Sequence, residues 1–124
     1  MANTDPQTVF TFISRCAPYG SGRPQVCLDA ALAAAVFEQE VNYVFMDDGV
    51  YQLLAGQNAE SIASKTLGSA LETLDLYGID EVLVEQQALQ QRGLSAQDLI
   101  MPVKVVAADV IADLIARSDL VVNL

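Results

Sequence analysis

Short apolar runs rich in β-branched and aromatic residues alternate along this chain with segments of helical periodicity. Each run is apolar throughout, which is typical of strands that helices cover on both faces of a sheet. Strands separated by helices pair in parallel, because the right-handed crossover needs the intervening helix. The alternation therefore predicts an α/β fold, a three-layer α/β/α sandwich with a five-stranded parallel sheet. The predicted strands are residues 8–14, 41–46, 81–84, 103–106 and 120–122.

The segments between these runs carry apolar residues at helical spacing. Pro24 suits the first turn of the first helix, where its missing N–H costs nothing. Asn58 is the expected N-cap of a long helix that ends at Gly78. Arg117 suits the last turn of the final helix. The predicted helical segments are residues 25–39, 50–54, 58–78, 86–92 and the stretch around 110–117.

The length of 124 residues suits a single domain, which we expect to span residues 8–124 after a flexible tail at residues 1–7. Apolar residues make up 52% of the chain and charged residues 18%. Ordinary domains contain roughly 45–50% apolar residues and about 25% charged residues. The excess of apolar sequence fits a chain that buries surface against partners, and it fits an alanine- and leucine-rich monomer equally well.

The net charge of −10 argues against direct contact with nucleic acid. The six basic residues are spread singly from Arg15 to Arg117 and form no stripe that can neutralise phosphates. An acidic chain is also repelled by anionic lipid, and no run reaches the ~18 apolar residues of a membrane span. The polar N-terminus lacks the pattern of a signal peptide. We therefore expect a cytoplasmic protein that binds neither nucleic acid nor membrane directly.

The chain has no histidine and two cysteines, Cys16 and Cys27. Their spacing fits no common metal motif, so we expect neither a metal nor another cofactor. Imidazole-based acid–base chemistry and Cys-His pairs are excluded. Cys16 follows the first strand beside Arg15, and Cys27 lies near the start of the first helix. Both surroundings can lower the pKa of a thiol, although a buried or bystander cysteine is the commoner case.

Three further features lie where strands end, the usual place for sites in open parallel sheets. Gly20-Ser21-Gly22 lacks the remaining residues of a dinucleotide or phosphate loop and is interpreted as a loop shaped by glycine and packed on a neighbour. Asp47-Asp48-Gly49 offers two carboxylates to Mg²⁺, but a capping turn is favoured, with Asp48 accepting backbone N–H groups and Gly49 supplying unusual dihedrals. Glu85 can act as a base or stand as a solvated residue at a helix start.

Five stretches of the sequence belong to one pattern. The run from Asp48 to Leu54 is the most specific of them. The stretches are Ala17-Pro18-Tyr19-Gly20 with Arg23, Leu28-Asp29-Ala30-Ala31-Leu32, Asp48-Gly49-Val50-Tyr51-Gln52-Leu53-Leu54 with Gly56-Gln57, Leu74-Asp75-Leu76-Tyr77-Gly78-Ile79 and Ala88-Leu89-Gln90-Gln91-Arg92-Gly93-Leu94. Together they cover nearly the whole chain after residue 7 and resemble the TusC/DsrF branch of the DsrE/F/H-like family.

That resemblance implies a DsrE/F/H-like domain of the Rossmann or flavodoxin-like kind and a place in a sulfur-relay complex. TusC-like chains assemble with TusB-like and TusD-like subunits into a heterohexamer. In the tRNA-modifying setting the complex passes persulfide sulfur, through a TusE-like carrier, toward 2-thiolation of the wobble uridine (mnm5s2U). In the related DsrEFH setting, similar subunits serve dissimilatory sulfur oxidation, and both settings remain open.

The family's catalytic subunit carries its persulfide cysteine eight positions before the glycine of an Ala-Leu-x-x-Arg-Gly segment. Counting back from Gly93 gives Glu85, and a carboxylate cannot carry sulfane sulfur. The resemblance therefore implies a non-catalytic subunit with no catalytic residue of its own. Two alternatives remain open: a thiol sulfurtransferase using Cys16 or Cys27, and a small-molecule or nucleotide module.

Overall fold

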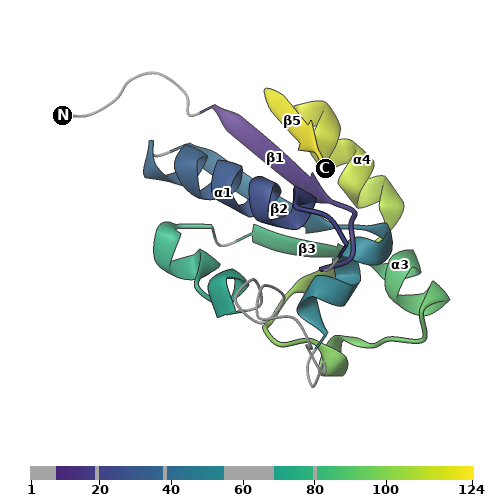
Figure 1. The fold of residues 1–124 in the computed structure, drawn as a ribbon. Helices are drawn as coiled ribbons and strands as arrows, with labels where there is room; N and C mark the ends of the chain where they lie inside the picture. The colour runs from purple at the N-terminus through teal and green to yellow at the C-terminus, as the bar shows by residue number, and fades with distance from the viewer. Residues whose placement is uncertain (1–7, 19, 38, 55–68, 80) are drawn as a thin grey trace.

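A single parallel sheet organises the molecule. The computed structural model describes residues 8–18, 20–37, 39–54, 69–79 and 81–124. The strands are β1 (Val9–Ser14), β2 (Glu40–Phe45), β3 (Glu81–Glu85), β4 (Lys104–Val106) and β5 (Leu120–Asn123). They lie in the order β4-β3-β2-β1-β5, and every neighbouring pair is parallel (Figure 1). The predicted five-stranded parallel sheet is confirmed, with strand bounds within one residue of those expected.

Helices cover both faces of this sheet, which confirms the predicted three layers. The helices are α1 (Arg23–Val36), α3 (Gln86–Gln91) and α4 (Ala108–Arg117). Phe12 and Tyr43 pack with α1 in the larger core, whereas their strand neighbours Ile13 and Val44 pack with α4 in the smaller one. Because successive strand residues point to opposite faces, α1 and α4 lie on opposite sides of the sheet (Figure 1).

The segment before β3 agrees with the predicted long helix in part, because residues 69–71 are helical. Its expected N-cap, Asn58, lies outside the described residues, whereas residues 74–77 form a 3₁₀ helix, η2 (Leu74–Tyr77). The Thr73 hydroxyl donates to the carbonyl of Ala70, and this local bond competes with a regular helical turn. Gly78 ends the segment at φ 83°, so the predicted glycine stop is confirmed.

The two faces of the sheet are covered unequally. The α1 face holds the larger core, and two further 3₁₀ segments, η1 (Asp47–Leu53) and η3 (Ala96–Asp98), follow β2 and α3. On the other face, α4 is the helix among the described residues that packs, through Ile111 and Leu114. None of the described helices combines the length and apolar character needed to cross a bilayer.

Candidate functional site

Glu85 ends β3 at the edge of the sheet where the carboxyl ends of all five strands meet. It is also the N-cap residue of α3, as expected for a helix start. The expectation that it is solvated is wrong, because the residue is only 8% exposed. Strand β3 lies between β2 and β4, and Glu85 pairs in register with Val106. An interior strand shelters its last residue, and the group sheltered here is a carboxylate.

Cys27 is buried in α1 and does not have the activated thiol that its position suggested. It is the fifth helical residue, one beyond the first turn, and it faces the core. Burial raises the pKa of the Cys27 thiol above its ordinary value, which corrects the expectation that the helix start lowers it. A buried thiol that holds its proton is a poor nucleophile.

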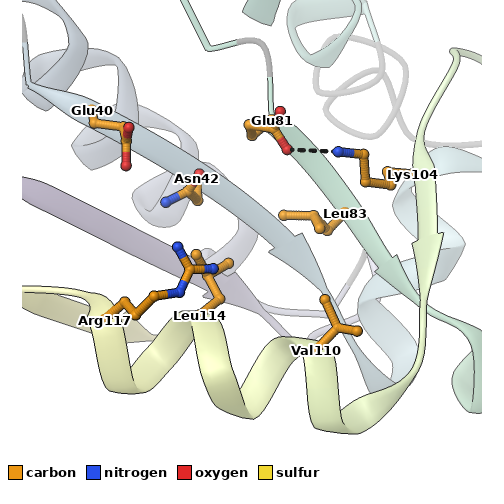
Figure 2. A pocket seen from close by; sticks show the side chains of 8 residues that line it. All are labelled: Glu40, Asn42, Glu81, Leu83, Lys104, Val110, Leu114 and Arg117. Carbon is orange, nitrogen blue, oxygen red and sulfur yellow. Dashed lines mark hydrogen bonds and ion pairs between the residues drawn. The ribbon is translucent and has the colours of Figure 1, made fainter.

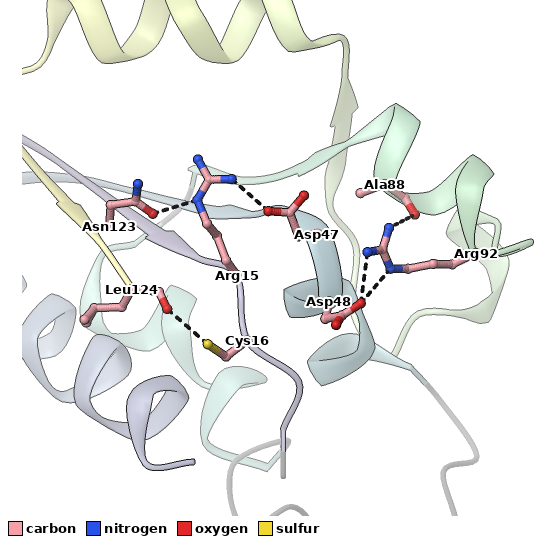
Figure 3. Close-up of polar contacts among 8 residues, drawn as sticks. All are labelled: Arg15, Cys16, Asp47, Asp48, Ala88, Arg92, Asn123 and Leu124. Atoms are coloured by element: carbon pink, nitrogen blue, oxygen red, sulfur yellow. Dashed lines mark hydrogen bonds and ion pairs between the residues drawn. The ribbon is translucent and has the colours of Figure 1, made fainter. Parts of the chain in front are cut away.

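Cys16 lies in the loop after β1, half-buried, with its neighbour Arg15 turned to other partners (Figure 3). Its Sγ donates to the carbonyl oxygen of Leu124 at 3.3 Å. Arg15 donates from Nε to Asn123 at 2.7 Å and from Nη1 to Asp47 at 2.9 Å. The guanidinium that was expected to stabilise a Cys16 thiolate is therefore engaged in an ion pair elsewhere.

The carboxylate of Asp48 accepts hydrogen bonds from an arginine side chain, whereas a capping residue was expected to accept them from backbone N–H groups. Arg92 donates to one carboxylate oxygen of Asp48 from Nη2 at 2.9 Å and from Nε at 3.1 Å. Its Nη1 donates to the carbonyl of Ala88, and its guanidinium lies 5.9 Å from the centre of the Tyr51 ring. Asp47 and Asp48 thus reach two different arginines (Figure 3). Within the described residues, no three His, Cys, Asp or Glu side chains are grouped so that they can hold a metal ion.

Gly49 is required by close packing and not by unusual dihedrals, which corrects the sequence interpretation. The residue with positive φ in this turn is Asp47, at 50°. A Cβ on Gly49 would overlap the carbonyl oxygen of Ser14. The glycine therefore lets η1 approach the end of β1 more closely than any other residue allows.

Gln52 is a structural residue that sequence reasoning missed. It is 3% exposed, and its Nε2 donates to Ser14 Oγ at 2.7 Å and to the carbonyl of Cys16 at 2.8 Å. It therefore fastens η1 to the end of β1 and to the loop that carries Cys16. The sequence signal for this role of Gln52 is its position within the Asp48–Leu54 run. The structure shows Val50 and Leu53, on either side of it, fully buried.

The Gly20-Ser21-Gly22 loop leads directly into α1. Gly20 has φ 92°, Gly22 is the N-cap residue, and the Ser21 hydroxyl accepts the backbone N–H of Arg23 at 3.3 Å. These are the features of a tight turn before a helix. All three residues are exposed.

The carboxyl edge of the sheet is therefore held together by its own polar groups. Arg15 binds Asp47, and Arg92 binds Asp48. Gln52 joins η1 to the end of β1. The Cys16 thiol donates to a backbone carbonyl, and burial raises the pKa of the Cys27 thiol. Such an arrangement fastens η1 to β1 and to α3, the helix that follows Glu85.

Sequence comparison places this chain among known proteins. The model of the DsrE/DsrF-like family matches residues 8–124. The chain is 45% identical over 96 residues to a protein named TusC homolog from Vibrio vulnificus, covering 77% of this chain and 81% of the relative. A TusC homolog from Pseudomonas aeruginosa is 35% identical over 112 residues, covering 90% and 94%. The intracellular sulfur oxidation protein DsrF of Allochromatium vinosum is 37% identical over 91 residues, covering 73% and 67%.

Structure comparison finds the same fold. The crystal structure of the ychN protein from E. coli superposes with a TM-score of 0.79 at 24% sequence identity. The match covers 96% of this chain and 100% of that one. At this identity the likeness concerns the fold, which agrees with the α/β sandwich described above.

Proposed function

This chain belongs to the DsrE/DsrF-like family, and from that premise we propose that it is a subunit of a sulfur-relay complex that does not itself carry the sulfur. The names of its relatives, TusC homolog and DsrF, support the sulfur-relay part. The second part depends on one observation. By the resemblance, the family's persulfide position falls on Glu85 of this chain, and a carboxylate accepts hydrogen bonds but forms no persulfide.

The surroundings of Glu85 support a role in framing a complex. The Arg92–Asp48 pair holds α3, which follows Glu85 directly, against η1. The steric fit of Gly49 and the two hydrogen bonds of Gln52 hold η1 against the end of β1. A subunit built in this way offers its neighbours a fixed surface, and the sulfur passes over cysteines of the partner chains.

The proposed partners are TusB-like and TusD-like subunits in a heterohexamer, with a TusE-like carrier receiving the sulfur. In this setting the complex serves 2-thiolation of the tRNA wobble uridine. The net charge of −10 fits such a division of labour, because an acidic subunit leaves contact with tRNA to another component. The relationship to DsrF supports the alternative setting, in which the complex serves dissimilatory sulfur oxidation.

Co-purification tests the assembly. The chain is tagged at its native locus and recovered from its host under gentle conditions. We expect two further family members to elute with it at equal stoichiometry in one complex. Recovery of a lone monomer contradicts the proposal.

Persulfide trapping tests the chemistry. The recovered complex is loaded with sulfane sulfur from a cysteine desulfurase and cysteine, alkylated, and analysed by peptide mass spectrometry. We expect the label on a partner's cysteine and none on Cys16 or Cys27, and Cys16→Ser should transfer sulfur at the normal rate. Label on Cys16, with transfer lost in Cys16→Ser, would establish the thiol sulfurtransferase instead.

Deletion of the gene separates the two settings. Loss of 2-thiouridine from tRNA, measured by nucleoside mass spectrometry and restored by the wild-type gene, supports the tRNA setting. Normal thiolation together with impaired sulfur oxidation supports the DsrF-like setting. Normal behaviour in both assays argues against a sulfur-relay role.

A further inference from the structure

A cavity of about 310 Å³ opens on the α4 face of the sheet (Figure 2). Glu40, Glu81 and Lys104, the first residues of β2, β3 and β4, line it, so it lies at the end of the sheet opposite Glu85. Asn42 of β2 and Leu83 of β3 line it from the sheet, and Val110 and Leu114 line it from α4. Among the described residues, α4 is the helix that packs on this face, and the cavity lies between it and the amino ends of β2 to β4. Its volume lies at the lower end of the range of ligand pockets, roughly 300–1,000 Å³, and so suits a small metabolite.

Asn42 brings an unsatisfied donor to this cavity. The residue is only 4% exposed, and its Nδ2 is buried with no hydrogen-bond partner among the described residues. It points to the α4 face because its strand neighbours Val41 and Tyr43 belong to the core on the other face. A buried N–H without a partner is unfavourable. A turn of the Asn42 side chain toward an acceptor in the cavity therefore gains a hydrogen bond that the described residues do not supply.

The charges around the cavity are balanced. Arg117 and Lys104 supply two cations, and Glu40 and Glu81 supply two carboxylates, with Lys104 and Glu81 3.4 Å apart. The balance disfavours a simple anion, which two carboxylates repel, and equally a simple cation. A molecule that carries both charges matches both sets.

The donors converge on one side of the cavity. The Nε of Arg117 donates a hydrogen bond to Asp113 at 3.2 Å. The guanidinium group extends toward Asn42 (Figure 2). The planar guanidinium is the side chain best suited to bind a carboxylate through two hydrogen bonds. Glu40 lies on the same side, at the start of β2, and Leu83 and Val110 make the apolar part of the wall.

We propose that this cavity binds a free α-amino acid with an apolar side chain. The carboxylate of the ligand lies between Arg117 and Asn42, its ammonium group faces Glu40, and its side chain packs on Leu83 and Val110. The site is separate from Glu85 and the contacts around it, which lie at the carboxyl end of the sheet. Its failure leaves the proposed function untouched.

Ligand dissection is the first test. The full-length chain, in the complex in which it is recovered, is titrated calorimetrically with L-valine and L-leucine. Leucine is compared with 4-methylpentanoate, which lacks the ammonium group, and with 3-methylbutylamine, which lacks the carboxylate. We expect saturable binding of at least one amino acid and about tenfold or more weaker binding of both analogues. Equal binding of either analogue, or no saturable binding up to about 10 mM, overturns the proposal.

Substitution is the second test. Arg117→Gln and Glu40→Gln change exposed residues and should leave the melting temperature unchanged, while each weakens binding of the amino acid by about tenfold. The matched control is Asp109→Asn, also exposed on α4 but not among the residues that line the cavity, and it should bind like the wild type. Wild-type binding by Arg117→Gln would refute the assignment of the carboxylate subsite.

Discussion

The two ends of the sheet satisfy their polar groups in different ways. At the carboxyl end Arg15 and Arg92 bind Asp47 and Asp48, and Gln52 donates one buried and one partly buried hydrogen bond. At the amino end, on the α4 face, the Nδ2 of Asn42 is buried without a partner among the described residues. Sites in open parallel sheets usually form at the carboxyl end. Here that end is held by internal contacts, although Gln52 Oε1 has no partner among the described residues. At the other end, the amide that lacks a partner, that of Asn42, lines a cavity.

The comparison also ranks the interactions that hold the carboxyl end. Exposed ion pairs contribute roughly 0–1 kcal/mol each, because water screens the charges. Steric fit and buried hydrogen bonds are not screened in this way, so Gly49 and Gln52 should matter more than Arg92. The substitutions below test this order and the contrast between the two ends.

The largest effect is expected at Gly49. Gly49→Ala places a methyl group against the carbonyl of Ser14, and we expect the free energy of unfolding to fall by about 3 kcal/mol or more. Urea denaturation measures it. The matched control is Gly22→Ala, where a Cβ meets nothing within 4 Å and the loss should stay below about 1 kcal/mol. Equal stability of the two variants would mean that close approach at Gly49 is not what holds this end.

Gln52 should follow. Gln52→Leu fills the same space but leaves Ser14 Oγ and the carbonyl of Cys16 without their donor, and we expect a loss of about 1–3 kcal/mol. Alkylation of Cys16 should become faster because its loop is released. The control is Gln90→Ala on the exposed side of α3, expected within about 0.5 kcal/mol of the wild type. Unchanged stability and alkylation in Gln52→Leu contradict the fastening role.

One arginine at each end of the sheet allows the stability of the two ends to be compared directly. Arg92→Gln removes the hydrogen bonds to Asp48 and Ala88, and we expect a loss of about 1 kcal/mol that shrinks at high salt. Arg117→Gln breaks only an exposed pair with Asp113 and should change stability by no more than about 0.5 kcal/mol. If the larger and salt-sensitive loss came from Arg117, the contrast between the ends would be reversed.

The smallest effect at neutral pH is expected at Tyr43. Its hydroxyl is buried without a hydrogen-bond partner among the described residues, so Tyr43→Phe should change stability by less than about 0.5 kcal/mol. Burial raises the pKa of the Tyr43 phenol and of the Cys27 thiol above 10.0 and 9.0, their ordinary values. The unfolded chain therefore loses these protons first, and stability that is intact below pH 9 falls as pH rises. Denaturation of Tyr43→Phe and Cys27→Ala between pH 7 and 11 should give flatter profiles than the wild type.

Sequence reasoning predicted those parts of the fold that depend on local patterns. The apolar runs fix the strands, Pro24 sits at the start of α1, and Gly78 stops the segment before β3. The alternation of strand and helix implies parallel pairing without knowledge of any particular contact. Each of these signals is contained within a few neighbouring residues, which is why it can be read from the chain alone.

The site could be predicted only in part, because its contacts join distant segments. The partners of Asp47 and Asp48 lie 32 and 44 residues away in the sequence, and no local pattern names them. The burial of Glu85 follows from the interior place of β3, which only the strand order reveals. Gly49 was interpreted through its dihedrals because the approach of Ser14 is invisible until the fold is known.

The margins of the sheet have a consequence for how this protein meets other molecules. The outermost strands, β4 and β5, are only three and four residues long, and β4 begins with a lysine. Such short edge strands offer an incoming strand few backbone groups to pair with, and Lys104 adds a charge at the β4 edge. Open-ended, fibre-like growth is thereby discouraged, and any lasting association is directed to helices and loops, where it can close on itself at a finite size.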